Sequence, residues 1–243
     1  EIITCSDIVV ANSVDEANQL KDLYAAPEER VAVVPLGVEH AFFAPGNQDA
    51  ARAALGLGRG SVVTYVGRVQ SLKGVDLALE MFAELRTENG VLLIVGGASG
   101  TGGDNEVRKL NQRIKELDLE EQVRLIPPQP HHILSTYYRA SDVVVVPSKS
   151  ESFGLVALEA AACGTPVVAA SVGGLKDLIL HGTTGYLVNE RDPKLYAQYA
   201  RQIIESPLLG AEIAMSAVEK AQQYSWQKTS DQVLNLYTSA ASR

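Results

Sequence analysis

The chain has 243 residues, of which 46% are hydrophobic and 21% charged, a balance typical of a folded globular protein and not of a disordered one. Its 21 Lys and Arg against 29 Asp and Glu give a formal net charge of −8. Because an acidic surface repels phosphate backbones, we expect no nucleic-acid partner. A small basic pocket for one phosphorylated ligand remains compatible with this charge.

The sequence predicts neither a membrane-spanning segment nor a leader. The longest apolar stretch, LVALEAAACGTPVVAA, contains Glu159 and is shorter than the roughly 20 residues of a span. The first residues, EIITCSDIVV, lack the basic region that precedes the apolar part of a signal peptide. Cys5 and Cys163 lie far apart in the sequence, so we expect no disulfide framework and a cytoplasmic location.

Apolar, strand-like runs alternate with amphipathic segments from the start of the chain. The pattern predicts a strand over 7–12, a helix over 13–24 that Ser13 opens, and a strand over 31–35. The stretch 36–60 contains loop residues and a short Ala-rich helix, and we interpret it as a domain boundary.

From residue 61 the alternation becomes regular. Strands are predicted at 61–67, 91–97, 123–128, 143–147, 166–170 and 185–188, and helices at 75–88, 104–117, 133–140, 153–162, after Gly174, after Asp192 and over 207–240 with a break at 224–226. Continuously apolar strands are buried on both faces, so the pattern predicts an α/β fold with a Rossmann-like parallel sheet flanked by helices. Ligands of such sheets bind beyond the carboxyl ends of the strands. The candidate loops therefore follow Val66, Val95, Ile126 and Val146.

The loop after Val66 reads GRVQSLKG and carries two cations, Arg68 and Lys73, five residues apart. At the ligand edge of a sheet they can converge on one anion, Arg through a fixed fork of donors and Lys as a mobile point charge. The alternative is that both are solvated surface cations.

The loop after Val146 leads into ESFGLVALEAAA, and we expect Ser152 and Phe153 to open a helix with Gly154 in its first turn. The free N–H groups there suit a phosphate, and glycine allows a close approach. Glu159 follows Glu151 by eight residues, about two turns into the predicted helix. Two carboxylates facing one ligand suit sugar hydroxyls better than phosphate. The alternative is a half-buried Glu159 and a Glu151 stabilised by the helix dipole.

Several other kinds of site are disfavoured. ASGTGGDNE is neither a phosphate-binding P-loop nor an intact dinucleotide fingerprint. By contrast, a base-binding loop stays possible at IPPQP, which contains Gln129, because its prolines make it rigid enough to face a flat base. The histidines at 40, 131, 132 and 181 lack metal-ligand spacing and no Asp-x-Asp occurs, so we expect no metal and read these rings as solvated or locally hydrogen-bonded. No G-x-S-x-G elbow indicates a serine hydrolase.

Taken together, GRVQSLKG, ESFGLVALEAAACGTPVVAASVGGLKDLI and GTTGYLV resemble the retaining GT-B glycosyltransferases of family four, the glycosyl transferases group 1. The resemblance extends from about residue 5 to residue 226, and Glu151 and Glu159 form its E-x7-E pair. It implies a hexosyltransferase that uses a nucleotide sugar, preferably UDP-N-acetylglucosamine or UDP-glucose, and no cofactor.

The resemblance also implies site roles. Arg68 and Lys73 would hold the donor diphosphate, Glu151 the hydroxyls of the donor sugar and Glu159 those of the ribose. Arg68, Lys73 and Glu151 would be the catalytic set, with front-face transfer in which the leaving phosphate deprotonates the acceptor. The other implied donor-binding residues are Gly67, Gln129, Ser152, Phe153, Gly154 and Leu155.

The implied domain order is a tail of the N-terminal acceptor domain at 1–36, the C-terminal donor domain of a GT-B fold at 37–224, and a crossover helix at 225–243. We expect the chain alone to bind donor but to be incomplete for transfer, since the acceptor domain supplies the other side of the active site. The final helix should have little to pack on, and its apolar face could promote a homodimer.

Two other functions remain open at this stage. One is a nucleotide-sugar epimerase on the same scaffold, and the other is a non-catalytic nucleotide-sugar-binding module. A Rossmann dehydrogenase is disfavoured by the broken glycine pattern.

Overall fold

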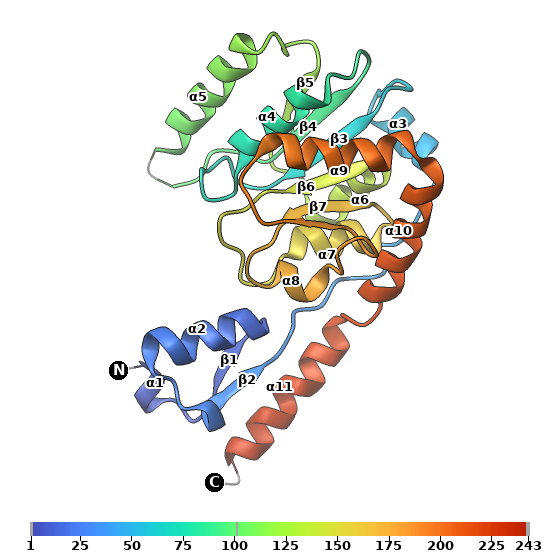
Figure 1. The fold of residues 1–243 in the computed structure, drawn as a ribbon. Coiled ribbons are helices and arrows are strands. Elements are labelled where there is room, and N and C mark those ends of the chain that lie inside the picture. The colour runs from blue at the N-terminus through green and yellow to red at the C-terminus, as the bar shows by residue number, and fades with distance from the viewer. Residues whose placement is uncertain (1, 101, 242–243) are drawn as a thin grey trace.

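The computed structural model of the chain describes residues 2–100 and 102–241 and is built on two parallel sheets (Figure 1). The large lobe contains a six-stranded sheet of order β5-β4-β3-β6-β7-β8. Its strands are β3 Val62–Val66, β4 Val91–Val95, β5 Val123–Ile126, β6 Val143–Val146, β7 Val167–Ala170 and β8 Tyr186–Val188. All six lie within the predicted strands, which confirms the Rossmann-like α/β fold class.

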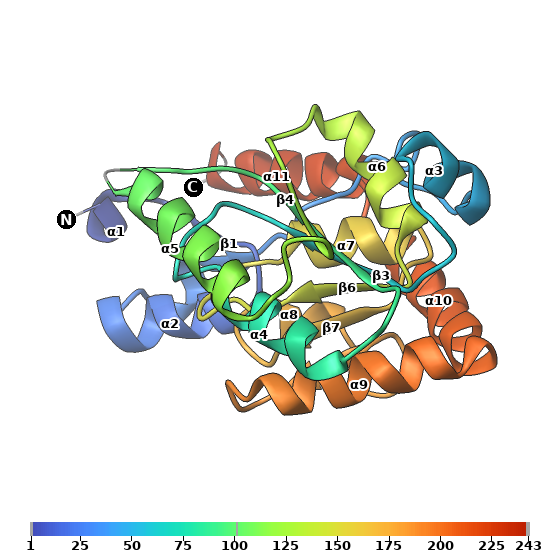
Figure 2. The same cartoon turned by 90° about the horizontal axis from the view of Figure 1, so that it is seen from above.

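Helices cover both faces of this sheet because both faces of its strands are apolar. The helices of the large lobe are α3 Gln48–Ala54, α4 Val75–Leu85, α5 Gly103–Glu116, α6 His131–Ala140, α7 Leu155–Ala162, α8 Leu175–Leu178, α9 Pro193–Glu205 and α10 Pro207–Ala221. Val143 and Val145 belong to the core shared with α4, α5 and α9, whereas Val144 and Val146 pack with α6 and α7. Figure 2 shows α7 and α9 on opposite sides of strands β6 and β7. Because successive side chains of β6 point to opposite faces of the sheet, helices pack on both faces and form a three-layer sandwich with the sheet in the middle.

The strand order reverses its direction of growth between β3 and β6. From β3 the sheet continues to β4 and β5 on one side, and from β6 to β7 and β8 on the other. Val63 pairs with Val143 and Thr64 with Val144 in parallel register, so both carboxyl ends open at the same edge. Such a switch point leaves a crevice between the two following loops, which is where ligands of open α/β sheets bind.

The N-terminal segment forms a small separate sheet beside the last helix. It contains α1 Ile2–Cys5, β1 Val9–Ala11, α2 Val14–Tyr24, a 3₁₀ turn at Glu28–Arg30 and β2 Val31–Val33, and it lies next to α11 Trp226–Ala241 (Figure 1). Thr229 donates from Oγ1 to the Pro35 carbonyl at 2.8 Å. No residue of α11 is buried, which confirms the expectation that this helix has little to pack on.

Helix α2 contacts the large lobe at α8. The Asp177 carboxylate accepts a hydrogen bond from the Val14 N–H at 3.0 Å, at the start of α2, and Lys176 forms an ion pair with Asp15. The hydrogen bond from Lys176 lowers the pKa of Asp15. A carboxylate at a helix N-terminus is stabilised by the dipole, so this contact fixes α2 to α8. Within the described ranges, none of the helices combines the length and apolar character that a bilayer span requires.

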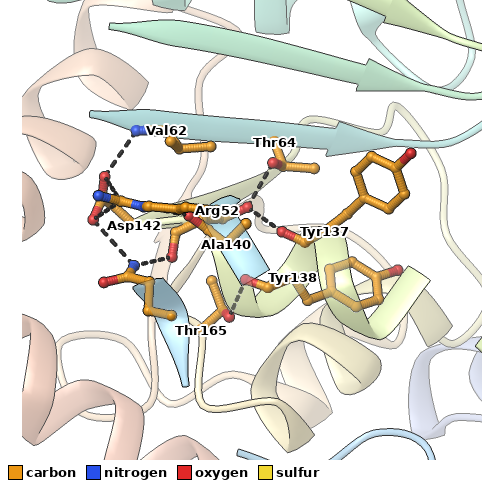
Figure 3. A network of polar contacts seen from close by, with 10 residues as sticks. Arg52, Val62, Thr64, Tyr137, Tyr138, Ala140, Asp142 and Thr165 are labelled. Atoms are coloured by element: carbon orange, nitrogen blue, oxygen red, sulfur yellow. Dashed lines mark hydrogen bonds and ion pairs between the residues drawn. The ribbon is translucent and has the colours of Figure 1, made fainter. Parts of the chain in front are cut away.

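A polar network connects α3, α6 and β3 at the amino ends of the central strands, opposite the carboxyl ends where the candidate loops lie (Figure 3). The Asp142 carboxylate accepts two hydrogen bonds from Arg52, both 2.8 Å, and one from the Val62 N–H at 2.8 Å. The end of α6 is capped by side chains: Arg52 donates to the Ala140 carbonyl and Thr165 to that of Tyr138. The bond to Ala140 satisfies a carbonyl that a helix terminus leaves without a helical partner, and the Tyr138 carbonyl accepts from the Ser141 N–H at 3.0 Å as well as from Thr165.

Replacing Asp142 by Ala should lower the free energy of unfolding by about 2–3 kcal/mol, because it leaves the Arg52 charge, only 14% exposed, and the Val62 N–H without their acceptor. Urea unfolding followed by circular dichroism measures this. Glu120→Ala is the control, since Glu120 is an exposed carboxylate in a turn, and it should change stability by less than about 0.5 kcal/mol. Equal effects of the two substitutions would contradict the structural role of the network.

Candidate functional site

The loops that follow β3 and β6 are packed backbone to backbone at the switch point. Lys149 donates from its N–H to the Leu72 carbonyl at 2.8 Å. A Cβ on Gly74 would lie 2.2 Å from the Pro147 carbonyl oxygen, so only glycine permits this approach. Close packing of the two loops places Lys73, on the first, next to Glu151, on the second.

Lys73 and Glu151 form a partly buried ion pair. The Lys73 Nζ lies 2.7 Å from Glu151 Oε2, with the two side chains 23% and 16% exposed. Ser148 donates a longer bond of 3.3 Å to the same oxygen. Lys73 is therefore not the solvated surface cation of the alternative interpretation.

Arg68 lies in the same loop and is exposed. Its backbone is fixed by the Tyr65 hydroxyl, which donates to the Arg68 carbonyl at 2.9 Å. The guanidinium makes no ion pair with any residue of 2–100 or 102–241. The cation is thus available to an anion that approaches the switch point.

Gly67 sits where the loops after β3 and β4 meet. A Cβ on Gly96 would lie 1.9 Å from the Gly67 carbonyl oxygen, and Gly67 itself donates to the Val95 carbonyl at 2.9 Å. On the next loop, Gln129 is half-buried and folds its side-chain amide back onto the Pro127 carbonyl at 2.9 Å. The loops after β3 and β4 are therefore in direct backbone contact at Gly67 and Gly96.

The prediction that Ser152 and Phe153 open a helix is wrong. Helix α7 begins at Leu155, and Gly154 precedes it in a left-handed conformation with φ of 106°, which a helix cannot contain. Ser152 is exposed in the loop, whereas Phe153 is buried. Glu159 is consequently only about one turn into the helix, closer to its N-terminus than predicted. The first N–H groups of α7 have no partner within the helix.

Two glycines missed by the sequence analysis hold the Glu151 loop. Gly174 donates its N–H to the Glu151 carbonyl at 3.0 Å, and a Cβ on Gly173 would lie 1.7 Å from the oxygen of that carbonyl. The Gly-Gly pair before α8 was the available signal, because adjacent glycines indicate close backbone contact. The pair therefore positions Glu151 from the far side of the loop.

Glu159 is buried between α7 and α6, with 4% of the residue exposed. Its Oε2 accepts from the Tyr138 hydroxyl at 2.7 Å, and its Oε1 lies 2.7 Å from His131 Nε2. Neither partner was predicted, because 28 residues separate His131 from Glu159 and no local pattern links them. The His131 side chain is 59% exposed, in keeping with the prediction of a solvated ring, but its hydrogen-bond partner is a distant glutamate and not a local group.

The loops at the switch point combine groups suited to a phosphorylated sugar ligand. Arg68 and Lys73 supply positive charge, and Glu151 supplies acceptors for hydroxyl groups, while Glu159 lies on the helix that follows the second loop. No group of three or more His, Cys, Asp or Glu that could hold a metal ion occurs within the described residues. The two cations can bind an anion, and the neighbouring Glu151 carboxylate can accept hydrogen bonds from hydroxyl groups.

Comparison with known proteins assigns the fold and the family. The sequence profile of the family "Glycosyl transferases group 1" matches residues 47–224. A curated relative, D-inositol 3-phosphate glycosyltransferase of Rhodococcus erythropolis, is 44% identical over 247 aligned residues that cover 99% of this chain and 55% of that protein. The chain thus spans little more than half the length of this relative.

Solved structures show the same similarity. Sucrose-phosphate synthase from Thermosynechococcus elongatus superposes with a TM-score of 0.91 at 31% identity, covering 99% of this chain and 60% of that one. Anabaena Alr3699/HepE in complex with UDP and glucose superposes with a TM-score of 0.90 at 27% identity, covering 96% and 64%. The fold is that of a GT-B glycosyltransferase, and the extent of the match is consistent with the C-terminal domain of that fold. From its sequence profile, its relatives and its fold, this chain belongs to the glycosyl transferases group 1 family.

Proposed function

We propose that the chain is the donor-binding half of a retaining hexosyltransferase that uses a UDP-sugar. The observation that carries this proposal is the Lys73–Glu151 pair at the switch point, where a cation for the diphosphate and a carboxylate for sugar hydroxyls lie 2.7 Å apart. The similar HepE structure, which contains UDP and glucose, supports a UDP-sugar. UDP-N-acetylglucosamine and UDP-glucose are the donors we favour.

In the proposed complex, Arg68 and Lys73 hold the two phosphates and Glu159 accepts from the ribose hydroxyls. Glu151 accepts from hydroxyls of the donor sugar. The loop residues Ser152, Phe153, Gly154 and Leu155 meet phosphate or sugar through backbone N–H groups, Gly67 gives the diphosphate room and Gln129 faces the base.

The proposed mechanism follows from where charge develops. Departure of the nucleoside diphosphate builds negative charge on its β-phosphate, and fixed cations stabilise that charge. Glu151 begins paired with Lys73, so binding of donor exchanges this ion pair for a diphosphate on Lys73 and a sugar hydroxyl on Glu151. In the front-face route, the departing phosphate oxygen accepts the proton of the acceptor hydroxyl on the same face of the sugar, so the configuration is retained.

We propose that residues 1–36 belong to the acceptor domain, 37–224 to the donor domain and 225–243 to a crossover helix. The described part of α11 exposes Leu234 and Tyr237, and together with Asp7, Ile8 and Val10 it lines an apolar groove of about 260 Å³. The remainder of the acceptor domain is the partner we propose for this surface; in its absence a second copy of the chain could cover it. Transfer to an acceptor would then need more than this chain.

Calorimetric titration of the chain with UDP, GDP, ADP, UDP-glucose and UDP-N-acetylglucosamine tests the proposal. We expect binding of the uridine compounds, with one site per chain, and weaker binding of GDP and ADP. A chain that binds no nucleotide, although circular dichroism shows it folded, would contradict the donor site.

A further inference from the structure

Glu159 is held by two donors that approach its two carboxylate oxygens from α6. Tyr138 is completely inside the protein, and burial, followed by the nearby Glu159 carboxylate, raises the pKa of its hydroxyl. The hydroxyl is therefore neutral and donates its hydrogen to Oε2. This inner oxygen is therefore bound to a donor that is itself buried.

The other oxygen, Oε1, is paired with a side chain that reaches solvent. His131 Nε2 lies 2.7 Å from it, and the His131 side chain is 59% exposed while that of Glu159 is 6% exposed. A carboxylate offers only lone pairs, so the ring must carry a hydrogen on Nε2 and donate it. Each carboxylate oxygen accepts more than one hydrogen bond, which leaves Oε1 able to accept from a ligand hydroxyl as well.

The His131 imidazole packs against a buried aromatic ring although its side chain is exposed. Its ring centroid lies 4.8 Å from that of Phe43, which is fully buried. The chain around Phe43 is bound to α6 through Arg139, which donates to the Phe42 and Ala44 carbonyls at 2.7 Å each. The contact with Phe43 and the hydrogen bond to Glu159 together restrain the orientation of the ring.

We propose that His131 is a positioning residue for nucleotide binding, which orients the Glu159 carboxylate toward the ribose hydroxyls through its Nε2–H. The terminal torsion of a glutamate is soft, so Tyr138 alone would leave the carboxylate plane free to turn about its inner oxygen. A second donor on Oε1 fixes that plane. The inference rests on the proposed function, because it assigns His131 to the ribose end of the donor site.

The test compares UDP with 2′-deoxy-UDP by calorimetry, because the ratio of the two dissociation constants isolates recognition of the ribose hydroxyl. The parent chain should bind UDP about tenfold or more tightly than 2′-deoxy-UDP, the usual effect of a hydrogen bond to a charged group. In His131→Ala the ratio should fall to about threefold or less. If His131 were merely structural, His131→Ala would weaken binding of both ligands equally and leave the ratio of the dissociation constants unchanged.

Matched variants sharpen the comparison. His131→Gln should restore most of the ratio, since its amide nitrogen can take the place of Nε2, whereas His131→Asn is too short to do so. His132→Ala removes the neighbouring exposed ring, which packs on Phe42 at 5.9 Å, and should leave the ratio at the parent value. Glu159→Gln should lower the ratio as much as His131→Ala does.

The outcomes separate the two ideas. A parent ratio near ten that His131→Ala leaves unchanged overturns the positioning role but keeps the donor site. A parent chain that binds no UDP, or does not discriminate between the two ligands, overturns the ribose site at Glu159 and the inference with it. Loss of the ratio in His131→Ala, with rescue by His131→Gln, supports both.

Discussion

Lys73→Ala is expected to weaken binding of UDP about tenfold to a hundredfold. A charge-assisted hydrogen bond to a diphosphate contributes roughly 1.5–3 kcal/mol, and this substitution removes one. It also leaves Glu151, which lies 2.7 Å from the lysine ammonium, as an uncompensated negative charge beside the phosphates. Both effects act in the same direction, so this variant should be among the most damaging to nucleotide affinity. Calorimetric titration with UDP measures the change.

Lys149→Ala is the matched control for this prediction. Lys149 lies in the neighbouring loop, is exposed and bonds through Nζ to the Ser71 hydroxyl at 2.7 Å. Removing it takes away the same charge from the same edge of the sheet, and screening by solvent should limit the loss of affinity to about threefold. If both variants lose affinity equally, the nucleotide is held by the overall positive potential at the carboxyl ends of the strands and not by a specific contact with Lys73.

Gly173→Ala should disrupt the site and the fold together. The residue has φ of 50°, where alanine costs about 1–2 kcal/mol, and the new Cβ would lie 1.7 Å from the Glu151 carbonyl oxygen. The contact is with backbone, which cannot swing aside, so the loop of Glu151 must shift. We expect a loss of about 3 kcal/mol or more in the free energy of unfolding, measured in urea, and at least a tenfold loss of UDP affinity.

Gly56→Ala provides the comparison that separates strain from collision. Gly56 has φ of 60°, but a Cβ built there meets nothing within 4 Å. Gly56→Ala should lower the free energy of unfolding only by the cost of alanine in the left-handed conformation, about 1–2 kcal/mol, and it should keep full UDP affinity. A Gly173→Ala variant that resembles Gly56→Ala in both measurements would show that the Gly173 contact does not position Glu151.

The order of elements and the edge that carries the site could be predicted because they depend on local chemistry. Uninterrupted valine runs such as 143–146 have no polar residue to turn toward water, so they become central strands of a parallel sheet. All four candidate loops begin directly after the last residue of a strand, at Val66, Val95, Ile126 and Val146. Because parallel strands place their carboxyl ends together, Arg68, Lys73 and Glu151 could be assigned to one edge before any contact was known.

The start of α7 shows where local reasoning ends. Ser152, Phe153 and Gly154 are compatible with a first helical turn, yet the helix begins only at Leu155. Gly154 has a φ of 106°, and a Cβ built on it would lie only 2.7 Å from the Leu175 side chain, so the packing of Leu175 leaves room for glycine alone. That neighbour arrives from a different segment, so the boundary is a result of packing.

By itself, the sequence determined the α/β class, the strands and the loops that bear the charged residues, since each follows from the periodicity and chemistry of neighbouring residues. Only the tertiary structure decided which of those residues meet. It paired Lys73 with Glu151 across 78 residues, set Gly173 against the Glu151 carbonyl and gave Glu159 the partners Tyr138 and His131. Such contacts depend on the order and register of the strands, which no short stretch of sequence contains.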